Sequence, residues 1–190
     1  MSNDLKPIRK TGDNRLPGEP DKEAFVHSMI RVDQAGEYGA KRIYEGQLAV
    51  LGNNEAAPLI QDMLAQEEKH LEHFNSLVAE RGVRPTILEP IWHIAGFALG
   101  AATASMGPKA AMACTVAVED VIGEHYAEQA EQLGEDESSL RDTIVNFRDD
   151  ELHHRDVSLE NGAEQAPAYE ILTGAVKAGT RLAIWLSKRV

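Results

Sequence analysis

Apolar residues recur every three or four positions through most of this chain, which is the spacing that places side chains on one face of an α-helix. Glycine, proline and asparagine interrupt the pattern and divide it into separate stretches. The predicted helices run over residues 21–51, 54–81, 108–133, 135–160 and 167–190. Alternating patterns typical of strands are almost absent from the sequence. The pattern therefore predicts an all-α protein.

The segment between the second and third predicted helices is almost uninterruptedly apolar. Residues 91–106 read IWHIAGFALGAATASM, a run of 16 residues that is too short to span roughly 30 Å of hydrocarbon. We expect this segment to lie on a membrane or to cover a channel, and packing over the bundle or in an oligomer interface is the open alternative. Trp92 and Trp185 suit an interfacial depth. The last predicted helix adds basic residues beside an apolar stripe, namely Lys177, Arg181, Lys188 and Arg189.

Four long helices with short turns and one longer crossover predict a ferritin-like four-helix bundle, followed by a C-terminal amphipathic helix. A chain of 190 residues fits one domain. Residues 1–20 combine prolines, glycines and mixed charge, so we expect a flexible N-terminal arm before a ferritin-like domain over 21–190. The start of the chain has no apolar core of the kind found in signal peptides.

Ionisable residues continue two of the apolar stripes. On the fourth predicted helix, the helical period leads from Leu140, Ile144 and Phe147 to Glu151 and His154. Asp150 and His153, the competing pair, instead share a polar face. On the second predicted helix, the same spacing leads from Ile60 and Met63 to Glu67 and His70, whereas Glu68 falls off the stripe. Each helix is therefore predicted to point one Glu-x-x-His pair inward.

The first and third predicted helices each turn one carboxylate, Glu37 and Glu119, toward the core. The order Glu, then Glu-x-x-His, occurs twice, and its two glutamates are 30 residues apart in the first half and 32 in the second. Two helical hairpins of one design, packed about a pseudo-two-fold axis, are expected to bring together six side chains. The set is Glu37, Glu67, His70, Glu119, Glu151 and His154.

This set of six is the pattern of a two-metal site. Four buried carboxylates repel one another and would be forced to take up protons, whereas two divalent cations cancel their charge. A Glu from two helices with Glu-x-x-His from two others is the signature of di-iron and di-manganese bundles. We expect two iron ions, with manganese less favoured. Gln66 and Asp150 are predicted to hold the histidine of the opposite helix. Chance pairing, with solvated or structural carboxylates, is the competing interpretation.

Charge and cysteine content narrow the classes of partner and compartment. A net charge of −12 disfavours nucleic acid, whose binding requires clustered basic residues. The single cysteine, Cys114, cannot form an internal disulfide and sits in an apolar run, which is typical of a core residue in a reducing compartment.

Long blocks of this sequence resemble the demethoxyubiquinone hydroxylases of ubiquinone biosynthesis. They include MIRVDQAGEYGAKRIYEGQLAVLG, AQEEKHLEHFN, AMACTVAVEDVIGEHY and FRDDELHHRD, and the likeness runs from about residue 25 to the end. The resemblance implies a flavin-independent di-iron monooxygenase that inserts one atom of O₂ into the ring of 3-demethoxyubiquinol. It also implies the same six ligands. His125 and Tyr126 match positions linked to substrate or electron transfer, with a surface histidine and a core tyrosine as the alternatives.

The resemblance further implies a polyprenylated quinol substrate and an external reductant, with NADH as the candidate. No Gly-x-Gly-x-x-Gly follows a strand pattern, so a built-in nicotinamide site is not expected. We expect a homo-oligomer, peripheral on the cytoplasmic face of the inner or cell membrane, with a lipid-binding ubiquinone-biosynthesis protein as a candidate partner. Ferritin-like iron oxidation or storage, and rubrerythrin- or manganese-catalase-like peroxide chemistry, share the ligand set and stay open alternatives.

Overall fold

A computed structural model describes residues 21–190, and the arm expected over residues 1–20 lies outside the described residues. Every element within the described range is helical. In chain order they are α1 (Lys22–Leu51), α2 (Ala57–Arg81), α3 (Glu89–Ser105), α4 (Pro108–Gln132), the 3₁₀ turn η1 (Glu135–Glu137), α5 (Ser138–Glu160), the 3₁₀ turn η2 (Ala163–Gln165) and α6 (Tyr169–Ser187). This arrangement confirms the all-α, ferritin-like prediction.

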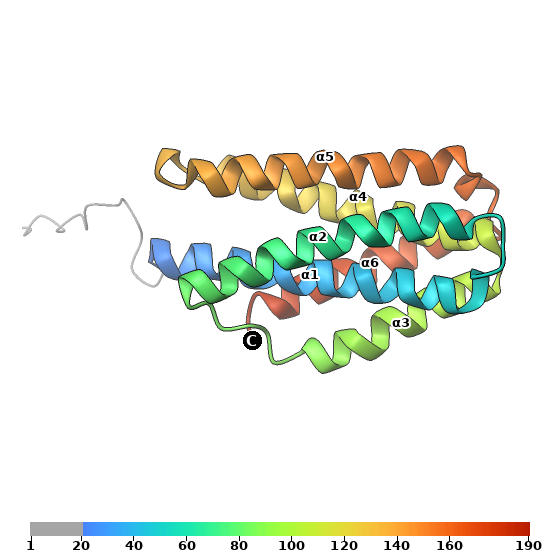
Figure 1. Ribbon diagram of the computed structural model, residues 1–190, viewed down its shortest axis with the longest axis horizontal. Coiled ribbons are helices and arrows are strands. Elements are labelled where there is room, and N and C mark those ends of the chain that lie inside the picture. The colour runs from blue at the N-terminus through green and yellow to red at the C-terminus, as the bar shows by residue number, and fades with distance from the viewer. Residues whose placement is uncertain (1–20) are drawn as a thin grey trace, which may run out of the picture.

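Four long helices form the body of the molecule. Helices α1 and α2 make one antiparallel hairpin and α4 and α5 make the other, and all four run lengthwise in Figure 1. Two apolar clusters fill the space between them. One is built around Ile30, Phe74 and Ile144, and the other around Ile60 and Met112. On α2 the residues between these clusters are Glu67 and His70, so the ionisable groups lie between two apolar layers.

The apolar crossover forms a sixth helix, α3, which the helical pattern did not reveal. It packs along α1 at very short range. A Cβ on Gly100 would lie 1.9 Å from the backbone oxygen of Ile43, and a Cβ on Gly46 would lie 2.2 Å from that of Phe97, so only glycine permits this approach. The crossover therefore packs over the bundle, while Ile91 and Ile94 stay exposed on its outer face.

Three helix boundaries differ from the expected ones for local reasons. Helix α2 begins at Ala57, because the side chain of Asn54 accepts a hydrogen bond from the Ala56 N–H and holds a turn before it. The residues expected to begin α5 form the separate 3₁₀ turn η1 instead, so α5 begins at Ser138. Helix α6 begins at Tyr169, after Ala168 adopts a left-handed conformation with φ of 51°. Among the described residues, no helix has the length and apolar character needed to cross a membrane.

Candidate metal centre

Six ionisable side chains from four helices converge in the middle of the bundle. They are Glu37 on α1, Glu67 and His70 on α2, Glu119 on α4, and Glu151 and His154 on α5. Each is at most 3% exposed. The geometry divides them into two overlapping groups of four, and within each group one potential ligand atom per residue lies within 4.8 Å of the others.

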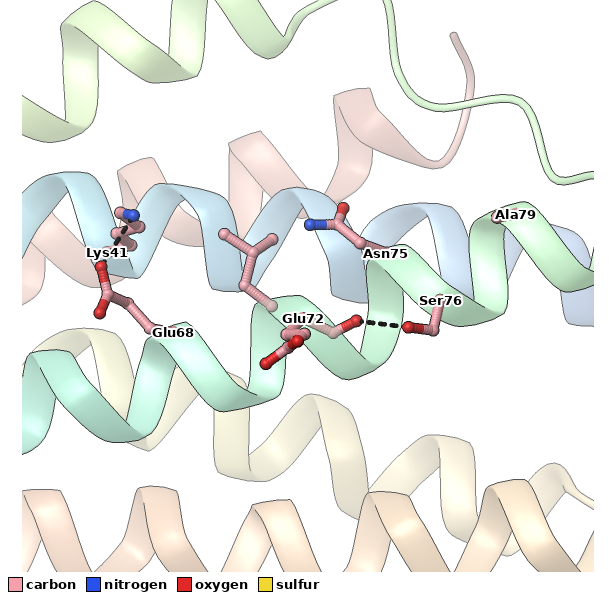
Figure 2. A pocket seen from close by; sticks show the side chains of 7 residues that line it. Lys41, Glu68, Glu72, Asn75, Ser76 and Ala79 are labelled. Atoms are coloured by element: carbon pink, nitrogen blue, oxygen red, sulfur yellow. Dashed lines mark hydrogen bonds and ion pairs between the residues drawn. The ribbon is translucent and has the colours of Figure 1, made fainter.

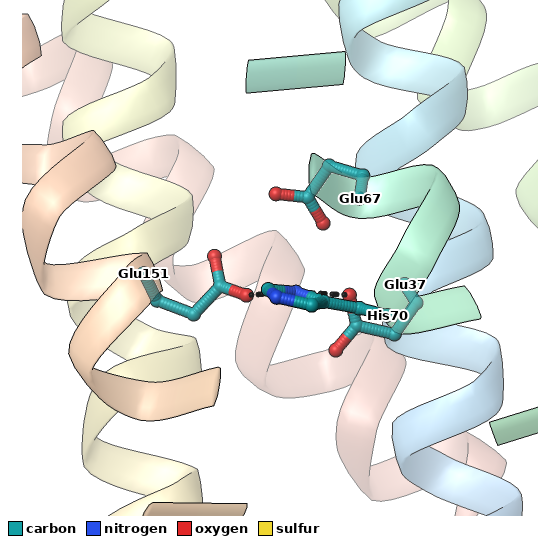
Figure 3. A group of neighbouring side chains, drawn as sticks. All are labelled: Glu37, Glu67, His70 and Glu151. Carbon is teal, nitrogen blue, oxygen red and sulfur yellow. Dashed lines mark hydrogen bonds and ion pairs between the residues drawn. The ribbon is translucent and has the colours of Figure 1, made fainter. Parts of the chain in front are cut away.

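The first group joins Glu37, Glu67, His70 and Glu151. Figure 3 shows the His70 ring lying between the carboxylates of Glu151 and Glu37. Its Nδ1 atom is 3.1 Å from Glu151 Oε1 and 3.5 Å from Glu37 Oε2. Carboxylates from two other helices thus flank one imidazole nitrogen.

The second group joins Glu67, Glu119, Glu151 and His154. His154 Nδ1 lies 3.1 Å from Glu67 Oε1 and 3.5 Å from Glu151 Oε2. Glu67 and Glu151 belong to both groups. Glu37 and Glu119 belong to one group each.

The outer nitrogen of each histidine contacts a residue of the opposite hairpin. His70 Nε2 lies 3.1 Å from Asp150 Oδ2, and His154 Nε2 lies 2.7 Å from Gln66 Oε1. These contacts leave both Nδ1 atoms facing the acids. His153, the neighbour of His154, is exposed to solvent, as its helical phase predicts.

Burial sets the protonation of the cluster when no cation is bound. Burial and the repulsion of Glu151 raise the pKa values of Glu67 and Glu119 well above their usual range. Burial also raises the Glu151 pKa, but the neighbouring imidazoles of His154 and His70 outweigh it and lower that pKa to about 2. Burial lowers the His70 pKa, yet its acidic partners raise it to about 10. These raised pKa values favour protonated Glu67 and Glu119 in the metal-free cluster.

Several buried atoms at the centre make no hydrogen bond in the described part of the chain. They are both carboxylate oxygens of Glu67, Glu119 Oε2, Glu151 Oε2 and His154 Nδ1. Buried polar atoms are nearly always paired, and the exceptions mark functional positions or unseen ions. These atoms are oxygen and imidazole donors of the kind that iron and manganese accept. The residues present therefore fit a pair of divalent cations.

Two tyrosines donate hydrogen bonds to Glu37 and Glu119, the two carboxylates that belong to only one ligand group each. Tyr126 on α4 donates its hydroxyl hydrogen bond to Glu37 on α1, and Tyr44 on α1 donates to Glu119 Oε1 on α4 over 2.8 Å. Burial raises the pKa of both phenols well above the usual value, so both stay protonated donors. Sequence reasoning selected Tyr126 and missed this role for Tyr44, although Tyr44 shares the Glu37 stripe.

His125 lies inside the bundle, which excludes a surface position. It is 7% exposed, and its Nε2 atom lies 2.9 Å from the side-chain nitrogen of Gln129 and 3.5 Å from Asp33 Oδ1. Asp33 is 2% exposed, and burial raises its pKa although His125 partly offsets the effect. The sequence analysis did not select Asp33 or Gln129. Asp33 stands one helical turn before Glu37, so its helical phase could have indicated that it turns inward.

An apolar cavity of about 380 Å³ lies between α1, α3, α4 and α6. Its walls include Val32, Ile43, Trp92, Leu99, Ile122 and Ile184. A different, polar hollow lies on the surface between α1 and α2, where Lys41 pairs with Glu68 over 2.9 Å (Figure 2). Glu68 thus faces away from the centre, as its helical phase predicts.

A ferritin-like helical bundle with a buried, two-fold repeated carboxylate–histidine cluster is the class of protein that the fold and site define. A family model described as "Ubiquinone biosynthesis protein COQ7" matches residues 24–187, and the chain belongs to this family.

Curated relatives cover nearly the whole chain. The Rhodospirillum rubrum "3-demethoxyubiquinol 3-hydroxylase" is 58% identical over 96% of this chain and 86% of the relative. The human "NADPH-dependent 3-demethoxyubiquinone 3-hydroxylase, mitochondrial" is 52% identical over 88% of this chain and 79% of the relative. The Saccharomyces cerevisiae "5-demethoxyubiquinone hydroxylase, mitochondrial" is 42% identical over 88% of this chain and 79% of the relative. These matches confirm the resemblance seen in the sequence.

Proposed function

We propose that this protein hydroxylates the ring of 3-demethoxyubiquinol, a polyprenylated quinol, with O₂ and two iron ions in ubiquinone biosynthesis. The observation that carries the proposal is the buried six-residue cluster, several of whose atoms have no hydrogen-bond partner among the described residues. The names of relatives 42–58% identical to the chain identify the reaction class. They do not favour iron storage or peroxide chemistry.

The ligand assignment follows the two groups of four. One ion takes Glu37 and His70, and the other takes Glu119 and His154. Glu67 and Glu151 would serve both ions, since they alone belong to both groups. Four carboxylates balance two divalent charges, which removes the repulsion that otherwise raises the glutamate pKa values. Bound iron supplies the electrons that activate O₂.

Residues around the ligands orient them and exclude water. Asp150 and Gln66 accept the outer N–H of the two histidines, which fixes the ring orientation and leaves Nδ1 free for metal. Tyr44 and Tyr126 hold the terminal carboxylates. Apolar layers above and below the centre keep it dry, which protects a reactive oxidant from side reactions. His125 is proposed, with Tyr126, to serve substrate or electron transfer.

The apolar cavity between α1, α3, α4 and α6 suits a quinol ring with an isoprenoid tail. Its α1 wall includes Gly36, the residue before Glu37, so the cavity lies along the same helix as the metal ligand. Helices α3 and α6 form its outer walls. They expose Ile91, Ile94, Leu182 and Trp185, and these apolar surfaces are the proposed contact with a membrane that delivers the substrate.

Each turnover needs two electrons from outside the centre, because one atom of O₂ leaves as water. The sequence resemblance implies NADH as the donor, whereas the names of several relatives, the human protein among them, specify NADPH. A reduced nicotinamide cofactor is therefore the proposed reductant. A lipid-binding protein of the pathway and a second copy of the chain are the proposed protein partners.

Deletion of the gene followed by quinone profiling tests the function in cells. The expected result is accumulation of demethoxyubiquinone, reversed by the wild-type gene and not by Glu151→Ala. Glu68→Ala is the matched control, because Glu68 is exposed and outside the cluster. A normal quinone profile in the deletion strain would show that the proposed function is wrong.

A further inference from the structure

The two hairpins repeat the same contacts around the centre. Tyr44 and Tyr126 each stand seven residues after a terminal ligand, Glu37 or Glu119, and each donates to the ligand of the other half. The repeat provides an internal comparison, because a position in one half shows what the fold accepts at the equivalent position in the other.

The comparison extends to a pair of buried glutamines. Gln47 and Gln129 each stand ten residues after the ligand glutamate. Gln47 donates to Thr115 Oγ1 over 3.4 Å, and Gln129 donates to Asp33 Oδ1 over 2.7 Å. Thr115 and Asp33 are themselves equivalent, each four residues before its ligand glutamate. The contact therefore repeats, but its acceptor is the hydroxyl of Thr115 in one half and the carboxylate of Asp33 in the other.

A second difference lies beside the first. The residue before the tyrosine is Ile43 in the first half and His125 in the second. Burying a carboxylate and an imidazole costs free energy that a threonine and an isoleucine do not. Asp33 Oδ2, moreover, has no hydrogen-bond partner among the described residues although it is buried. Because the fold packs the equivalent positions without charge, packing does not account for Asp33 and His125.

Gln129 links these two residues in a defined way. Its side-chain nitrogen lies 2.7 Å from Asp33 Oδ1 and 2.9 Å from His125 Nε2. Asp33 Oδ1 accepts the hydrogen bond from the amide nitrogen of Gln129, so the carboxyl group fixes the amide with its nitrogen turned toward Asp33. The second N–H of that amide then faces His125, whose Nε2 accepts it. This arrangement selects the neutral ring with its proton on Nδ1.

We propose that Asp33 is a positioning residue of the hydroxylase, which orients Gln129 and thereby holds His125 in the Nδ1–H form. The proposal rests on the proposed function for its role in turnover. It also makes the two halves of the centre inequivalent, since this carboxylate–amide–imidazole chain flanks the Glu37 side and has no counterpart beside Glu119.

The internal repeat supplies the variants. Asp33→Thr and His125→Ile each install the residue of the equivalent position, and the double variant makes the two halves alike. Each single variant is expected to lower the hydroxylation rate by roughly tenfold or more. The double variant should lose no more than His125→Ile alone, because Asp33 acts through His125. Thr115→Val, at the matched position of the other half, should stay within roughly twofold of wild type.

Two further readouts separate positioning from a general loss of structure. Iron binding at two ions per chain should be preserved, and the thermal midpoint should not fall below that of wild type. In metal-free protein labelled with ¹⁵N-histidine, the ring shifts of His125 should report the Nδ1–H form, and Asp33→Thr should give a mixture of the two neutral forms. The shifts of His70 and His154 should stay unchanged. If Asp33→Thr does not fold, Asp33→Asn takes its place.

An unchanged His125 ring form, a rate within twofold of wild type, or additive losses in the double variant would each overturn the proposal. Absence of hydroxylation by the wild-type enzyme would instead reject the proposed function, while the ring shifts would still test the link between Asp33 and His125.

Discussion

His70 on α2 places its outer nitrogen 3.1 Å from the carboxylate of Asp150 on α5, whereas its counterpart His154 faces the neutral amide of Gln66. The two imidazoles at the centre therefore have partners of different charge. A carboxylate partner makes an imidazole the stronger metal ligand.

Replacement of Asp150 by Asn should weaken metal binding at the His70 position. We expect a loss of roughly 10–100-fold in Fe(II) affinity for one of the two ions, with the second unaffected. Titration of metal-free protein with Fe(II) or Co(II) measures this directly. Asp149→Asn is the control and should bind metal as the wild type does, because Asp149 is exposed. Equal affinities for Asp150→Asn and wild type would contradict the role of Asp150 as the partner of His70.

Removal of a bridging carboxylate should affect both ions. Glu67→Ala is expected to retain fewer than one iron per chain, because Glu67 belongs to both ligand groups. Metal analysis of the reconstituted protein gives the ratio. Glu68→Ala is the adjacent control and should keep two irons, since its side chain is 53% exposed. Retention of two irons by Glu67→Ala would rule out the bridging role.

The stability of the metal-free protein should fall as pH rises. Glu67 and Glu119 have raised pKa values in the folded state, so their stabilising protonation is complete below about pH 4.5 and is lost above it. His70 acts in the same direction between pH 6.5 and about 10. Glu151, with its lowered pKa, matters only as pH falls from 4.5 toward about 2.

Thermal unfolding between pH 5 and 8 tests this expectation. The midpoint of the metal-free protein should drop by roughly 2–4 °C for each kcal/mol lost, and bound metal should flatten the profile because it replaces the protons. A metal-free midpoint that rises over this range would contradict the raised glutamate pKa values.

The close approach of α3 to α1 should depend on glycine. Gly100→Ala places a methyl group against the Ile43 backbone oxygen and is expected to cost about 1–3 kcal/mol in the free energy of unfolding. Denaturant unfolding measures the change. Gly174→Ala on α6 meets nothing within 4 Å and should be neutral or slightly stabilising. Equal stability of the two variants would show that α3 is not packed tightly on α1.

Membrane contact should depend on the outer faces of α3 and α6. Ile94 is 70% exposed, and Ile94→Asp with Trp185→Asp should abolish binding to anionic vesicles while the fold and iron content stay intact. Vesicle sedimentation provides the measurement. Val145→Asp, on the exposed side of α5, should bind normally. Binding by the double variant at the wild-type level would exclude this face as the membrane contact.

The helical period alone predicted which acids turn inward, because burial of one face fixes the phase of every residue on a long amphipathic helix. Glu67 and Glu68 differ by one position, and the phase separated them correctly. The same logic failed for α3, whose residues are apolar on all sides and therefore show no period. It also passed over Asp33, although Asp33 stands one turn before Glu37. The role of Tyr44 could not be predicted, because its partner Glu119 lies on a different helix and only the packed bundle shows the contact.

The most direct test of the central claim is the fate of labelled oxygen. Protein reconstituted with Fe(II) is supplied with NADH or NADPH, a short-tailed demethoxyubiquinone and ¹⁸O₂, and the quinone product is analysed by mass spectrometry. The account predicts one ¹⁸O atom in the hydroxylated ring, and none with Glu151→Ala. Oxidation of iron without oxygen entering the ring, or a hydroxyl group derived from water, would contradict it.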